Sequence, residues 1–88
     1  MEREKYEIAS RHLTTLTDQD LANVQRTVLD YLNTHEFVTN RILRDIVGIT
    51  YDQAIFFYVQ MLNRKVLQKI GARSTTRYVL NPKRGKKQ

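Results

Sequence analysis

The sequence predicts a small α+β domain, in which a three-helix core is followed by a C-terminal two-stranded hairpin. Apolar residues recur at helical spacing in three stretches between residues 17 and 64, and each stretch follows a threonine that can cap a helix. Beyond residue 65 the pattern changes to two short β-type segments, which are separated by a polar turn that opens with glycine. A length of 88 residues is enough for one domain and too short for two.

The first helix is predicted to begin after Thr17, where Asp20 takes the place of the glutamate or glutamine of a capping box. We expect this helix to end between residues 33 and 36. Its core-facing stripe consists of Leu21, Val24, Val28, Tyr31 and Leu32. Residues 1–16 are predicted to form a leading arm or a short helix, because apolar residues recur at helical spacing there as well.

The second helix is predicted over residues 40–47, after an extended pair formed by Phe37 and Val38. Thr39 can cap its start, and Gly48 can end it in a left-handed conformation.

The third helix is predicted to follow Thr50 and to run to about Arg64. Gln53 completes a capping box of the T-x-x-Q type at its start. The connection between the second and third helices is therefore only about three residues long, as in a helix-turn-helix.

The hairpin is predicted to pair residues 66–70 with residues 77–80 across the turn GARSTT (71–76). Tyr78 and Leu80 share one strand face, which we expect to lie toward the helices. Pro82 ends the second strand because it cannot continue the hydrogen-bond ladder. Residues 82–88 are predicted to be a basic disordered tail.

This order of elements is that of a winged helix-turn-helix, and we assign residues 17–81 to that domain. The chain resembles a bacterial winged-helix pattern between Leu21 and Leu80, through the stretches VLDYLNTHEFVTNRILRDIVGIT, YDQAIFFYVQMLNRKVLQK and TRYVL. It is most similar to the C-terminal winged helix of RecG-related proteins, which are named as ATP-dependent DNA helicases. The resemblance implies a non-catalytic domain of a larger protein. It also implies glycine where this chain has Lys65.

The basic residues are concentrated in the second part of the chain. Residues 1–52 carry six basic and nine acidic side chains, whereas residues 53–88 carry nine basic and no acidic ones. Such asymmetry favours an acidic partner, of which nucleic acid is the usual example. We predict that the chain contacts duplex DNA through the hairpin, the tail and polar positions of the third helix, namely Lys69, Arg73, Arg77, Lys83, Arg84, Tyr51, Gln53 and Gln60. Arg41 and Arg44 could add backbone contacts, although Asp45 beside them weakens that idea.

The third helix is unusually apolar for a helix that enters the major groove of DNA. Its predicted outward positions include a protein-interaction surface made of Tyr51, Ile55, Phe56 and Val59, while Asp52 nearby would repel phosphate. Such a surface needs cover from a second copy, another domain of a parent chain, a partner protein or residues 1–16. The alternative function is therefore a protein-interaction or dimerisation module without physiological DNA binding.

The residues offer no support for an enzyme. The chain has no cysteine, its two histidines have no metal-ligand spacing, and no phosphate-binding glycine motif is present among its three glycines. We expect no cofactor and no metal. No apolar run is long enough to span a membrane, and no signal peptide is visible, so we expect a cytoplasmic protein with a role such as transcription regulation.

Overall fold

The computed structural model describes residues 14–82 as three helices followed by a two-stranded antiparallel sheet. The helices are α1 (Asp18–Tyr31), α2 (Asn40–Val47) and α3 (Tyr51–Asn63), and the strands are β1 (Leu67–Ile70) and β2 (Arg77–Leu80). A 3-10 turn, η1 (Arg73–Thr75), joins the two strands. The predicted α+β order of elements is confirmed. The tail from residue 83 and most of the predicted leading arm lie outside the described residues.

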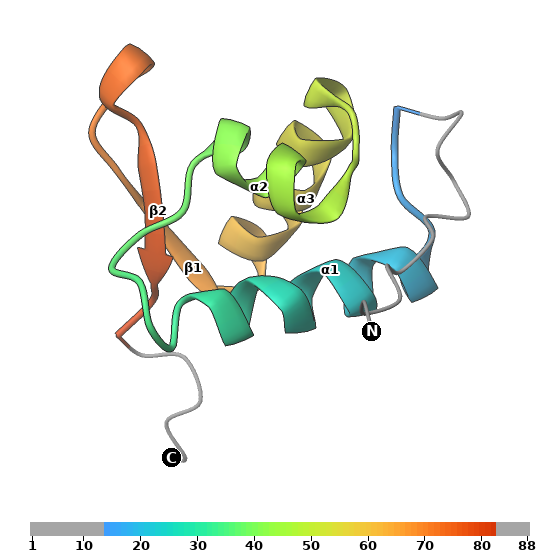
Figure 1. Cartoon of the computed structure of the whole chain (residues 1–88), viewed down its shortest axis with the longest axis horizontal. Coiled ribbons are helices and arrows are strands. Elements are labelled where there is room, and N and C mark those ends of the chain that lie inside the picture. Colours follow the sequence, from blue (N-terminus) through green and yellow to red (C-terminus); the bar gives the residue numbers. More distant parts are fainter. Residues whose placement is uncertain (1–13, 83–88) are drawn as a thin grey trace, which may run out of the picture.

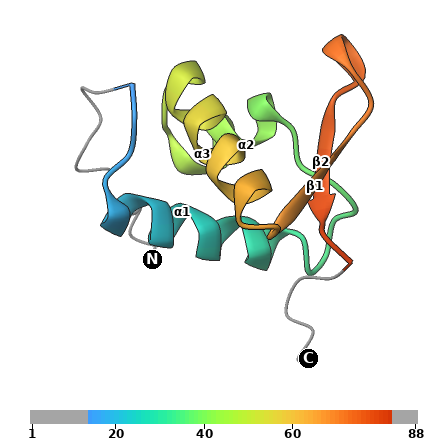
Figure 2. The ribbon, with the colours of Figure 1, turned by 180° about the vertical axis from the view of Figure 1, so that it is seen from behind.

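α1 forms the base of the molecule, and α2 and α3 lie above it (Figure 1). The hairpin stands at one end of this helical layer, and its tip points away from α1 in both Figure 1 and Figure 2. α1 therefore covers one side of α2 and α3, and it leaves the opposite faces of α2, α3 and the hairpin uncovered.

Threonine caps begin all three helices, as the sequence predicts. The hydroxyl of Thr50 accepts a hydrogen bond from the Gln53 amide at 3.0 Å, and the Gln53 side chain accepts one from the Thr50 amide at 3.1 Å. Thr17 and Thr39 accept equivalent backbone bonds, each at 3.1 Å. Each bond satisfies an amide that the first helical turn leaves without a partner.

The helix ends differ from the prediction in one place. α1 ends at Tyr31, earlier than expected, and Leu32 caps it. α2 ends at Val47 and is capped by Gly48, whose φ of 83° is the left-handed conformation predicted for that glycine. α3 ends at Asn63, in agreement with the prediction of about Arg64.

The core lies where the three helices and β1 meet. Val24 and Val28 of α1 are buried against Ala54, Phe57 and Met61 of α3 in one cluster. Other fully buried members are Val38, Leu43 and Leu67, which come from the loop after α1, from α2 and from β1. One apolar face from each element thus closes a single core, as the helical and strand periods require.

The sheet pairs Leu67 with Leu80 at one end and Ile70 with Arg77 at the other. The extended pair at residues 37–38 adds to β2, since Val38 and Tyr78 exchange two backbone hydrogen bonds of 2.9 and 2.8 Å. Tyr78 faces the helices as predicted, and its ring stacks on that of Tyr58 at a centroid distance of 3.7 Å.

The turn between the strands is tighter than a plain loop. Gly71 has a φ of 77°, and a Cβ atom at this position would lie 2.3 Å from the carbonyl oxygen of Thr75. The Thr75 hydroxyl accepts from the Ala72 amide at 3.2 Å and donates to the Ala72 carbonyl at 2.9 Å. These contacts close the predicted six-residue turn around η1, which the sequence did not indicate.

Candidate functional site

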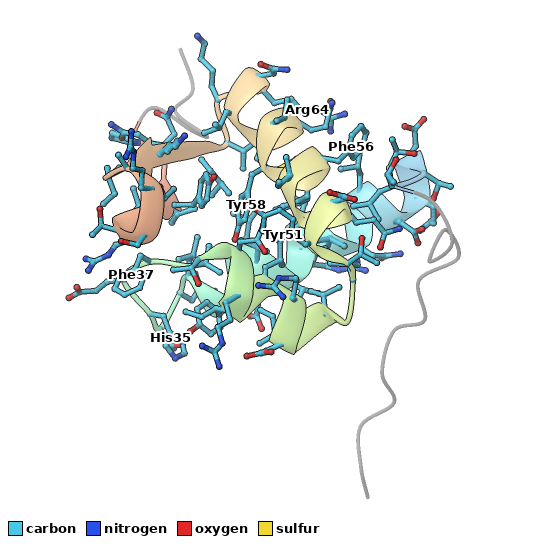
Figure 3. All side chains as sticks on the ribbon, turned by 90° about the horizontal axis from the view of Figure 1, so that it is seen from above. His35, Phe37, Tyr51, Phe56, Tyr58 and Arg64 are labelled. Atoms are coloured by element: carbon cyan, nitrogen blue, oxygen red, sulfur yellow. The ribbon has the colours of Figure 1, made fainter. Side chains whose placement is uncertain are left out.

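A groove opens between the start of α2, the outer face of α3 and the hairpin. It has a volume of about 750 Å³ and lies on the face of the molecule that is turned away from α1, which Figure 3 shows from above. Polar groups from the start of α2 and from the hairpin, those of Thr39, Asn40, Ser74 and Thr76, line parts of its wall.

Four cationic side chains line the groove. Arg41 and Arg44 come from α2, Lys69 comes from β1 and Arg73 comes from η1. None of the described residues that line the groove carries a carboxylate. Cations that surround a concave surface without counter-charges produce a focused positive potential, which attracts anions.

The structure gives Arg41 and Arg44 more weight than the sequence did. The nearby charge of Asp45 weakened the expectation that they contact the DNA backbone, but the Asp45 side chain is exposed and does not line the groove. The two arginines lie three positions apart on α2, which places them on one face, whereas the next residue points about 100° away. That spacing was the signal available in the sequence.

Arg44 is held in place by its neighbours. Its Nε donates to Asn40 Oδ1 at 2.6 Å, and its guanidinium carbon lies 5.5 Å from the centre of the Tyr51 ring. A hydrogen bond and a cation–π contact restrict the rotamers of this long side chain, so less side-chain entropy is lost when it binds an anion.

Arg73 lies at the tip of the hairpin and has a φ of 53°. A left-handed backbone is unusual for a residue with a side chain. Because Gly71 and Thr75 fix the turn around it, the exposed Arg73 side chain is carried beyond the end of β1 at the rim of the groove.

The floor of the groove is apolar. Tyr51, Ile55, Val59 and Leu62 share one face of α3 because residues three and four positions apart are neighbours on a helix. The first three are respectively 56%, 42% and 46% exposed. Leu62 is half-buried, and it contacts the core while it also lines the groove.

Phe56 does not belong to this surface, and its prediction as part of the same exposed patch needs correction. It lies about 100° around the helix from Ile55, on the side of α3 that faces the segment before α1 (Figure 3). It is half-buried and packs against the core. Leu16, at the end of the predicted leading arm, is buried and belongs to the same core cluster.

Gln53 is also corrected as a DNA-contacting candidate, because its side chain is fully buried. It caps α3 through Thr50, and its Nε2 donates to the carbonyl oxygen of Thr15 at 3.2 Å. Gln53 therefore connects α3 to the segment before α1, and it does not face the groove.

The other predicted DNA contacts are scattered. Arg77 is exposed but does not line the groove, because its guanidinium carbon lies 4.5 Å above the Phe37 ring. Gln60 is half-buried on the same flank of α3 as Phe56. Lys83 and Arg84 lie outside the described residues. The structure thus brings together Lys69, Arg73 and Tyr51 of the predicted set.

Tyr58 connects the three elements that form the groove. Its hydroxyl donates to the carbonyl oxygen of Thr39 at 2.9 Å, just before α2, and its ring stacks on Tyr78 of β2. Burial raises the pKa of the Tyr58 phenol far above its ordinary value, and the neighbouring Tyr78 adds to this effect. The phenol therefore remains a neutral hydrogen-bond donor at ordinary pH.

Residues 14–82 show no sign of metal chemistry or of a membrane span. No group of three or more histidine, cysteine, aspartate or glutamate side chains in this range could hold a metal ion. Within the same range, every helix is too short or too polar to cross a bilayer.

A comparison of the chain with protein-family models, with curated proteins and with solved structures gives no match.

Proposed function

We propose that the chain is a winged helix-turn-helix domain that binds duplex DNA through its groove, with the hairpin as the wing. One observation carries this proposal: four cations from α2, β1 and η1 surround one groove whose described lining has no carboxylate. A row of phosphates is the partner that such an arrangement suits, since each phosphate can be neutralised by a separate lysine or arginine.

The arrangement of the elements supports the same function. In DNA-binding domains of this type the third helix enters the major groove and neighbouring elements contact the backbone. Here α2, α3 and the hairpin all line one groove, and Ile55 and Val59 on the open face of α3 are exposed. Contacts to phosphates fix position and supply affinity, but they carry no sequence information by themselves.

A second candidate function is protein interaction, and the apolar floor favours it. Ile55 and Val59 are each more than two-fifths exposed and could be buried by a partner protein or by another domain of a parent chain. A second copy docked face to face would bring two sets of groove cations together, so like-charge repulsion opposes that form of dimerisation.

The first prediction concerns the salt dependence of DNA binding. Lys69→Ala combined with Arg73→Ala should weaken binding to a mixed-sequence duplex about tenfold or more. The slope of log K against log salt should become shallower by about 2, because each lost phosphate contact removes about 0.9. Fluorescence anisotropy titrations at several salt concentrations measure both quantities.

The matched control removes two cations that lie outside the groove. Arg26→Ala combined with Arg64→Ala causes the same change in net charge, but neither residue lines the groove. This variant should retain most of the affinity and of the salt slope. Equal losses in the two variants would show that overall charge, and not the groove, binds DNA. If the unmodified chain does not bind duplex DNA even at low salt, the proposed function is wrong and the apolar floor becomes a protein-binding surface.

A further inference from the structure

The face of α3 that lines the groove has almost no group that can hydrogen-bond a base edge. Ile55 and Val59 are aliphatic and exposed, and Leu62 continues the same stripe. Two hydroxyls belong to α3 residues that line the groove: that of Tyr58 already donates to the carbonyl oxygen of Thr39, and the Tyr51 ring lies under the guanidinium of Arg44. A helix of this kind cannot distinguish bases by the paired hydrogen bonds that arginine, asparagine or glutamine make.

The base edges of the major groove offer one apolar feature, which is the C5-methyl group of thymine. An aliphatic side chain that contacts this methyl group removes apolar surface of both partners from water. The surrounding cations determine which kind of apolar partner suits the floor, because they favour a polyanion over a neutral or basic surface.

The spacing of the two central side chains fits this role. Ile55 and Val59 lie four positions apart, which is about 6 Å along the helix axis. Base pairs repeat about every 3.4 Å, so the two side chains span about two base steps when the helix follows the groove. The major groove is about 12 Å wide and can admit an α-helix.

We infer that α3 recognises thymine methyl groups in the major groove through Ile55 and Val59, so that the domain prefers thymine-rich duplexes. This inference rests on the proposed function, since it needs a duplex held by the four cations. It also assigns a ligand, the thymine methyl group, to the apolar floor. Base recognition would then depend on apolar contacts and not on hydrogen bonds.

The test compares two duplexes that differ only in these methyl groups. One contains thymine, and in the other every thymine is replaced by deoxyuridine, which keeps the hydrogen-bonding pattern of the base. The unmodified chain should bind the thymine duplex about tenfold more tightly, since each contacted methyl contributes about three- to fourfold and two side chains are involved. Competition anisotropy at a single salt concentration measures this ratio.

Two variants show where a preference arises. Ile55→Ser combined with Val59→Ser should lower the ratio to about one, while the contribution of the cations to binding remains. The control is Ile46→Ser, which changes an isoleucine that is 36% exposed on α2 but does not line the groove, and it should keep the tenfold ratio. Circular dichroism should show unchanged helix content in both variants, because serine has about the same helix propensity as isoleucine and valine.

The possible results separate the inference from the proposed function. Equal binding of the two duplexes by the unmodified chain overturns the inference and leaves DNA binding intact. A preference that persists in the Ile55 and Val59 variant also overturns it, because the preference would then come from the shape of the duplex. A lack of binding to either duplex at low salt overturns both.

Discussion

At the scale of single residues, Lys65 is the clearest case of a side chain in a backbone conformation that favours glycine. Its φ is 60°, and it directly follows Arg64, which caps α3 with a negative φ of -89°. The left-handed region costs a residue with a Cβ atom about 1–2 kcal/mol, of which glycine avoids most. This explains why the resemblance to the winged-helix pattern implies glycine at this position.

We therefore expect Lys65→Gly to raise the free energy of unfolding by about 0.5–1 kcal/mol, since the larger entropy of glycine in the unfolded chain offsets part of the gain. Urea denaturation followed by circular dichroism measures the change. Gly48→Ala is the matched control, because Gly48 has a φ of 83° and no atom within 4 Å of an added Cβ. Alanine there should destabilise the domain by about 1 kcal/mol. An unchanged stability in both variants would contradict this account of backbone strain.

At the scale of elements, Tyr58 holds the hairpin and α2 against α3, and this connection depends on a neutral phenol. Burial raises the pKa of Tyr58, and burial likewise raises that of Tyr78, which stacks on it. The folded state thus retains protons that the unfolded chain loses near the ordinary tyrosine pKa of about 10. Stability is complete below that pH and falls as the pH rises above it.

Tyr58→Phe should accordingly show a shallower loss of stability above about pH 10 than the unmodified chain. One such group contributes a slope of up to about 1.4 kcal/mol per pH unit. At pH 7 the same variant should be less stable by about 1–3 kcal/mol, because it loses the hydrogen bond to Thr39 and leaves a carbonyl without that donor. Urea titrations at pH 7, 9 and 11 test both effects. The decisive quantity is the difference between the two profiles, because every other contribution is shared by both proteins, and parallel profiles would contradict the role of Tyr58.

At the scale of the whole molecule, one core joins the helices and the hairpin, and Phe57 lies at its centre with no exposed surface. Phe57→Ala should destabilise the domain by about 3–5 kcal/mol, through lost burial and a residual cavity. Helical circular dichroism and tyrosine fluorescence should change together during denaturation. Val59→Ala removes an exposed side chain of the same helix and should change stability by less than about 1 kcal/mol. If the tyrosine fluorescence changed at a different denaturant concentration from the helical signal, the domain would contain a part that unfolds separately.

The order of elements could be predicted because its signals are local. Each threonine cap, the left-handed Gly48 and the change to strand period lie within a few residues of the boundary that they indicate.

The candidate site was predicted less completely, because its composition depends on contacts between distant segments. Phe56 is half-buried against the core cluster that includes Leu16, and the buried Gln53 donates to the carbonyl oxygen of Thr15, which lies 38 positions away in the chain. Arg41 and Arg44 form a cationic site only together with Lys69 and Arg73 of the hairpin, which line the same groove and are distant in sequence.

The bridge between Val38 and Tyr78 has a consequence for the order of events in folding. Its two hydrogen bonds connect the loop after α1 to β2, so α2, α3 and β1 all lie between the paired residues in the chain. The helices can form from neighbouring residues, whereas this pairing requires closure of a long loop and is entropically slow. The hairpin can form early as a local unit, but its docking belongs among the last steps. One wall of the groove is therefore completed only when the rest of the chain has already folded.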